Sequence, residues 1–140
     1  MGLGNPEFQL EFKLVRLCRD IINGDYNNEA EVRSEFTRTI RNYLEDNPKL
    51  KGIKINEEVT IIDGRIDARI GKFVIEFESP IKNKKLRTKV SDPYIKKIKT
   101  YIQNLKEEGF YSRGIVTNGV ELVFVDEDGE IVERGSLCEI

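Results

Sequence analysis

Three acidic residues lie in a stretch that otherwise favours β-strands, residues 64–80, with the sequence GRIDARIGKFVIEFESP. They are Asp67, Glu76 and Glu78, at positions where a buried sheet would favour valine. Two carboxylates directly opposite each other on neighbouring strands repel, which costs a sheet roughly 0.2–1 kcal/mol. A divalent cation reverses that sign, because carboxylates about 5 Å apart can share one ion. The spacing therefore indicates a site for a hard metal ion with oxygen ligands.

A two-residue turn at Gly71-Lys72 would join the two halves of this stretch into a hairpin. In that register Asp67 lies opposite Glu76, and Glu78 follows one pleat further along. The other expected cross-strand pairs are Ile70–Phe73, Arg69–Val74, Ala68–Ile75 and Arg65–Glu78. The face expected to cover the core holds Ile66, Ala68, Ile70, Phe73, Ile75 and Phe77. The opposite face holds Arg65, Asp67, Arg69, Val74, Glu76 and Glu78.

A simpler interpretation of the acidic face stays open. The face could be exposed to water, with Arg65 pairing with Glu78 and Arg69 lying near Asp67. Exposed ion pairs of this kind are common and contribute little to stability. The pattern of charges alone does not separate this interpretation from a metal site.

The composition limits the chemistry that is available. The chain has 140 residues and no histidine, which excludes Ser-His-Asp and Cys-His centres and histidine-bound zinc. Cys18 and Cys138 lie far apart without metal-ligand spacing, so two reduced thiols are predicted. We find neither an apolar run of membrane-spanning length nor a signal-peptide pattern, so a cytoplasmic protein is expected.

The elements that position the acids follow from periodicity and turn residues. Residues 1–47 are predicted to be helical, with apolar stripes from Leu10 to Ile22 and from Val32 to Tyr43, and with Asn28 capping the second helix. Residues 52–135 are predicted to form a core sheet with a crossover helix. That helix has Asp92 as N-cap and Pro93 at its first position. Asn118-Gly119 is predicted as the turn pair of a later hairpin.

This order of elements predicts an α/β sandwich: one domain over residues 1–140, with a central mixed β-sheet flanked by helices. The chain could also be a fragment of a larger protein. A basic segment follows the acids, and its cations would suit a polyanionic partner or a solvated loop equally well. The candidate nucleic-acid-binding residues are Lys82, Lys84, Lys85, Arg87 and Lys89.

Asp67, then eight residues, then Glu76-Phe77-Glu78 after a hydrophobic strand, resembles the core motif of the PD-(D/E)xK nuclease superfamily. The resemblance covers residues 28–125 and is nearest to the nuclease-like N-terminal domains of restriction-system DNA methyltransferases and restriction subunits. It implies a restriction-endonuclease-like fold and a Mg²⁺-dependent DNA endonuclease, with Mn²⁺ as a substitute. Asp67 and Glu76 would be the metal-binding acids.

The chain departs from the family pattern at one position, because Glu78 stands where the family usually has lysine. Glu78 could act as a general base or a further metal ligand, or it could mark an inert site. Lys97 and Tyr101 match a Gln-x-x-x-Tyr element of the family, so Lys97 could supply the missing charge from the helix. It could equally be a surface lysine. Glu29 matches a further acid that the family often turns toward the metal.

Three functions follow as alternatives. The first is a DNA endonuclease domain, with a methyltransferase or recognition module in the same protein or complex and a homodimer for cutting both strands. The second is a catalytically inactive nuclease-like module that binds DNA. The third is a protein-interaction domain without DNA or metal.

Overall fold

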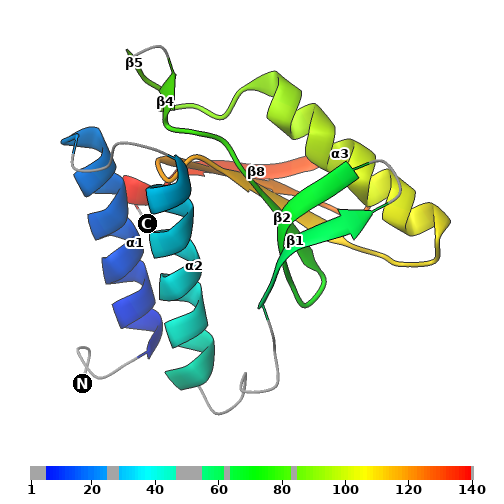
Figure 1. Cartoon of the computed structure of the whole chain (residues 1–140), viewed down its shortest axis with the longest axis horizontal. Coiled ribbons are helices and arrows are strands. Elements are labelled where there is room, and N and C mark those ends of the chain that lie inside the picture. The colour runs from blue at the N-terminus through cyan, green and yellow to red at the C-terminus, as the bar shows by residue number, and fades with distance from the viewer. Residues whose placement is uncertain (1–5, 25–28, 47–54, 62–63, 83–84, 140) are drawn as a thin grey trace.

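A computed structural model of the chain describes residues 6–24, 29–46, 55–61, 64–82 and 85–139. Across these ranges a mixed six-stranded sheet carries helices on both faces, which confirms the predicted α/β sandwich (Figure 1). The strand order is β1-β2-β3-β6-β7-β8. Within the same ranges, no helix combines the length and apolarity needed to cross a bilayer.

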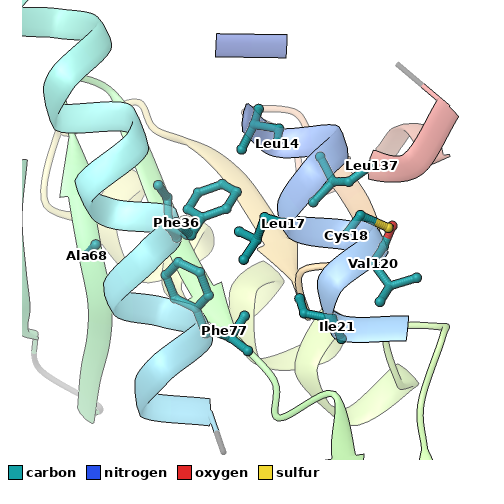
Figure 2. Close-up of a cluster of buried hydrophobic side chains, with 11 residues drawn as sticks. Leu14, Leu17, Cys18, Ile21, Phe36, Ala68, Phe77, Val120 and Leu137 are labelled. Carbon is teal, nitrogen blue, oxygen red and sulfur yellow. The ribbon is translucent and has the colours of Figure 1, made fainter. Parts of the chain in front are cut away.

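One face of the sheet is covered by two helices, α1 (Pro6–Ile22) and α2 (Glu29–Asp46) (Figure 1). Their apolar residues recur at helical spacing and meet the sheet in one buried cluster (Figure 2). The rings of Phe36 and Phe77 meet edge to face, with centroids 5.2 Å apart. The predicted cap at Asn28 lies outside the described residues. The cluster holds Leu14, Leu17, Cys18, Ile21, Val32, Phe36, Ala68, Ile75, Phe77, Val120 and Leu137.

The main strands of the sheet are β1 (Ile55–Ile61), β2 (Gly64–Ile70), β3 (Phe73–Phe77), β6 (Arg113–Thr117), β7 (Glu121–Val125) and β8 (Ile131–Ser136). A two-residue turn at Gly71-Lys72 joins β2 to β3, and Gly71 takes the left-handed φ of 57° that favours glycine. Ile70 pairs with Phe73, Arg69 with Val74 and Ala68 with Ile75. These three predicted pairs are confirmed.

The helix α3 (Asp92–Glu107) covers the other face and connects β3 to its parallel neighbour β6 (Figure 1). A Cβ on Gly114 of β6 would lie 2.7 Å from Ile98, so glycine lets the helix approach the strand closely. The sheet therefore has a core on both faces, and the prediction of a single core face was wrong. The apolar stripe of α3 covers the side that carries the acids. This second core holds Val74, Val90, Ile95, Ile98, Tyr101, Ile102, Leu105, Val116, Val123 and Val125.

The two cysteines form a disulfide, so the prediction of reduced thiols was wrong. After β8, the short helix η3 (Leu137–Glu139) packs beside α1, and the Leu137 amide donates to the Val120 carbonyl at 2.7 Å. This return of the chain brings the Cα atoms of Cys18 and Cys138 to 5.3 Å. The contact depends on tertiary packing between residues 120 positions apart, which cysteine spacing does not reveal.

The hairpin between β6 and β7 is also wider than predicted. β6 ends at Thr117 and β7 begins at Glu121, so three residues separate the strands instead of the Asn118-Gly119 pair alone. The Asn118 side chain accounts for the difference, because its Oδ1 accepts from the amides of Val120 and Glu121 at 2.9 and 2.8 Å. A side chain that bonds its own backbone stabilises this longer turn.

Candidate functional site

Asp67 lies where β2 and β3 cease to pair. The ladder runs from Ile70–Phe73 to Ala68–Ile75 and does not include the predicted Asp67–Glu76 pair. Instead, Asp67 Oδ2 accepts a hydrogen bond from the Phe77 amide at 2.7 Å. Its other oxygen, Oδ1, lies 3.0 Å from Nη1 of Arg33 on α2. The carboxylate therefore replaces a backbone partner of β3 and sits at the opening between the strands.

Glu76 is buried on the α3 face of β3, with 1% of the residue exposed. Neither of its oxygens has a partner with normal hydrogen-bond geometry among the described residues. Lys97 Nζ lies 3.1 Å from Oε2 and forms an ion pair. Burial and the negative charge of Asp67 raise the pKa of Glu76 to about 7, although Lys97 opposes that rise. Asp67 therefore lies close enough for its negative charge to disfavour the ionised form of Glu76.

Lys97 projects from α3 toward Glu76, with 45% of its side chain exposed. Its Nζ lies 6.0 Å from the Tyr94 ring centre and 5.6 Å from the Tyr101 ring centre, within cation–π range. Burial lowers the pKa of Lys97, but its interactions with Glu76 and Tyr101 outweigh that effect and raise it. The ammonium group is therefore held as a cation beside a buried acid.

Glu78 is also buried, but donors surround its carboxylate. The Ser91 amide donates to both of its oxygens, and the Ser91 hydroxyl donates to Oε2. Arg87 Nη1 lies 3.3 Å from Oε1. Ser91, not the predicted Asp92, is the N-cap of α3, and its side chain makes no capping bond because its hydroxyl is bound to Glu78. Glu78 thus fixes the start of α3.

In the described part of the chain, two acids remain as candidate metal ligands, Asp67 and Glu76. No three acidic, histidine or cysteine residues there are grouped so that they could hold a metal, so Glu78 does not join Asp67 and Glu76 in a cluster. The side chain of Glu29, at the first position of α2, lies outside the described residues. Asp67 and Glu76 offer oxygen ligands only, and such ligands fit a hard divalent cation, although Glu76 Oε2 already lies 3.1 Å from Lys97 Nζ.

The basic segment gives a mixed result. A small hairpin of β4 (Ile81–Lys82) and β5 (Lys85–Leu86) projects from the body near the start of α3 (Figure 1). Lys85 and Lys89 are exposed, whereas Arg87 is half-buried in its ion pair with Glu78. The side chains of Lys82 and Lys84 lie outside the described residues. Arg87 therefore pairs with the buried Glu78, whereas Lys85 and Lys89 are exposed candidates for binding nucleic acid.

Two residues of the site were missed by sequence analysis. Arg33 follows Val32 in the buried stripe of α2, and that position could have indicated a cation facing the sheet. Ser91 directly precedes Asp92-Pro93, a typical helix start, but its bond to Glu78 spans 13 residues and has no local signal. Both contacts are long-range polar contacts between elements.

Comparison with known proteins supports the fold. No protein-family model matches the chain, and no curated protein matches it. Among solved structures, it is similar to the one titled "cryoEM structure DrdV-DNA complex", with a TM-score of 0.59 and 21% sequence identity. The similarity covers 92% of this chain and 12% of that chain. At this identity the similarity shows a shared fold.

Proposed function

We propose that the chain is a Mg²⁺-dependent DNA endonuclease domain in which Asp67 and Glu76 hold the metal. The environment of Glu76 carries the proposal. A carboxylate this deeply buried costs free energy even with Lys97 Nζ 3.1 Å from one of its oxygens, and a neighbouring acid adds to that cost. A bound ligand can compensate this cost, and for a buried carboxylate beside a second acid the ligand that fits is a divalent cation. A strongly perturbed carboxylate of this kind is typical of functional sites.

The residues of the site then take distinct roles. Asp67 and Glu76 bind Mg²⁺, with Mn²⁺ as a substitute, and the ion supplies the positive charge that activates water and neutralises the scissile phosphate. Lys97 lies beside Glu76 and would contact the same phosphate. Glu78 holds Ser91 and so keeps α3, and with it Lys97, in place. We therefore assign Glu78 a positioning role instead of that of a general base.

DNA is the proposed partner. The structure that shares the fold was determined in complex with DNA. Lys85 and Lys89 are exposed near the start of α3 and could bind phosphates through charge. Because this chain corresponds to 12% of that solved chain, sequence recognition would come from another module, such as a methyltransferase or recognition domain. A homodimer would allow both strands to be cut.

A nuclease-like module that binds DNA without cutting it is the second candidate. It is favoured by the ion pairs that already neutralise the acids: Asp67 with Arg33, and Glu76 with Lys97. In this alternative the ion pairs are permanent and replace the metal. A measurement of metal binding, made independently of cleavage, separates the two candidates.

The test combines metal binding with plasmid cleavage. We expect Mn²⁺ to bind the wild-type chain by isothermal titration calorimetry, and plasmid DNA to be nicked with Mg²⁺ or Mn²⁺ but not with chelator. Asp67→Asn should abolish both, because it removes a charged oxygen ligand. Lys97→Ala should reduce cleavage by roughly 10²-fold, the scale for losing one charge-stabilising group, and retain Mn²⁺ binding.

Matched controls lie nearby. Lys96→Ala removes an exposed lysine on the same helix, and Glu107→Gln removes an exposed acid at its end; neither should change binding or cleavage. DNA binding without Mn²⁺ binding or cleavage would favour the non-cleaving module. Cleavage that persists in Asp67→Asn would contradict the proposed site.

A further inference from the structure

The sheet face under α1 and α2 is less completely buried along β6 and β7 than the face under α3. Side chains alternate between the two faces of a strand, so neighbours in the sequence can be compared directly. On the α3 face, Val116 and Val123 are 0% exposed. Their neighbours on the other face, Ile115 and Phe124, are only half-buried. One face of these two strands is therefore closed by its helix, and the other keeps apolar surface within reach of solvent.

Two adjoining hollows lie over this less buried part of the sheet. One, of about 510 Å³, lies between the sheet and helices α1 and α2, and the other, of about 560 Å³, continues over β7 and β8 to the turn after β7. Phe124 and Glu133 line both, so the two form one groove, which we call the apolar groove. Each hollow is in the size range of pockets that bury a ligand, roughly 300–1,000 Å³. The half-buried apolar side chains along the groove are Leu10, Ile40, Phe73, Ile115, Leu122 and Phe124.

The charged residues along the apolar groove are almost all acidic. Glu11, Glu133 and Glu139 are exposed around the part next to α1. The one cation among the lining residues, Arg113, already pairs with Glu127 at 3.6 Å. An acidic rim repels a polyanion such as DNA and attracts a cationic partner. The acids that line the groove are Glu11, Asp126, Glu127, Asp128, Glu133 and Glu139.

The shape of the groove favours a helix as the occupant. On the opposite face, α3 covers the same strands with an apolar stripe that buries the valines of β6 and β7. A helix laid on a sheet is the general way in which a sheet face of this architecture is closed. An apolar groove with a polar rim is also the usual receptor for the apolar side of an amphipathic helix.

We propose that the apolar groove binds an amphipathic helix of a partner protein, whose apolar side lies over β7 and whose lysines or arginines lie beside the acidic rim. The partner is cationic because the rim is acidic, and it is apolar on one side because the floor is apolar. The inference goes beyond the proposed function. It does not depend on the metal site, because Glu76 lies on the α3 face of the sheet.

The first test uses a labelled synthetic peptide of about 18 residues, roughly five helical turns. Leucines at helical spacing form its apolar side, lysines flank them, and alanines fill the remaining positions. Fluorescence anisotropy at constant ionic strength measures its affinity for the wild-type chain. We expect it to bind at least about tenfold more tightly than a matched peptide with glutamate for lysine, because several rim charges then change from attraction to repulsion. A second matched peptide, with glutamine for leucine, should lose binding.

The second test changes the rim without touching the core. The double variant Glu11→Lys with Glu133→Lys replaces two exposed acids and should weaken binding of the basic peptide by roughly five- to tenfold, since each exposed ion pair contributes up to a few-fold. Its matched control, Glu107→Lys with Glu108→Lys, makes the same charge change at the exposed end of α3, away from the groove. The control should bind the peptide as wild type does. Circular dichroism checks that both variants keep the fold.

The third test locates the bound peptide by its effect on backbone amide NMR shifts. The basic peptide should shift the amides of residues 10–14 and 122–125, which border the apolar groove. If the basic peptide does not bind the wild-type chain, the proposal is wrong. It is equally wrong if the two double variants weaken binding alike, or if the shifted amides lie in α3, because the peptide is then held by charge elsewhere on the surface.

Discussion

Both faces of the sheet are buried, but the buried side chains on the two faces differ in polarity. Under α1 and α2 the core cluster is apolar, with Phe77 packed against Phe36 and a disulfide at its margin. Under α3 an apolar core of similar character adjoins two buried carboxylates on or next to β3, Glu76 and Glu78. Alternation along β3 thus places Phe77 in the core under α1 and α2 and the Glu76 carboxylate beside the core under α3.

The two buried acids, Glu78 and Glu76, differ in the hydrogen-bond donors that surround them. Glu78 accepts from the Ser91 amide and hydroxyl and pairs with Arg87, so its charge is well compensated. Glu76 has an ion pair with Lys97 but no hydrogen bond of normal geometry, and its pKa rises to about 7. Burial is therefore common to both acids, and the donors around each carboxylate are what distinguish them.

The largest effect should come from the apolar face. Phe77→Ala removes a ring that is buried against Phe36, and we expect it to lower the free energy of unfolding by about 3–5 kcal/mol. Urea denaturation followed by circular dichroism measures this. Phe12→Ala is the control, because Phe12 lies on α1 with 58% exposure and should change stability by less than about 0.5 kcal/mol. If Phe77→Ala lowered the free energy of unfolding by less than Phe12→Ala, the packing of Phe77 in this core would be contradicted.

A smaller effect is expected from the compensated acid. Glu78→Gln leaves an amide group facing the donors of Ser91 and Arg87, and should cost about 2–3 kcal/mol of stability. The same denaturation assay applies, at pH 8. A neutral or stabilising result would mean that these contacts do not hold the start of α3.

The smallest effect should have the opposite sign and depend on pH. The pKa of Glu76 is higher in the folded chain, about 7, than the ordinary value of 4.5, so the folded state binds more protons between these values. Its contribution to stability is therefore present at low pH and is lost as pH rises toward 7 and beyond. Glu76→Gln should match wild type near pH 5 and exceed it by on the order of 1–2 kcal/mol at pH 8, less than the roughly 3 kcal/mol of the full pKa shift because the variant also loses the ion pair with Lys97. If the free energy of unfolding had the same pH dependence in wild type and in Glu76→Gln, the raised pKa of Glu76 would be contradicted.

Sequence reasoning succeeded where structure is determined locally. The glycine of Gly71-Lys72 specifies the turn, which sets the register of β2 and β3. For Lys97 the helical spacing left two interpretations open, and the structure places its Nζ 3.1 Å from Glu76. It failed where distant elements meet. The pairing of Asp67 with Arg33, which spans 34 residues, depends on how α2 lies across the sheet edge, and no local pattern encodes that.

The bridge between Cys18 and Cys138 turns nearly the whole chain into a covalent ring. A single backbone cut between these residues opens the ring but releases no fragment. After limited proteolysis, the two pieces should migrate together on a non-reducing gel and separate when a thiol reductant is added. Loss of mass from the intact species would be confined to the short ends that lie outside the ring.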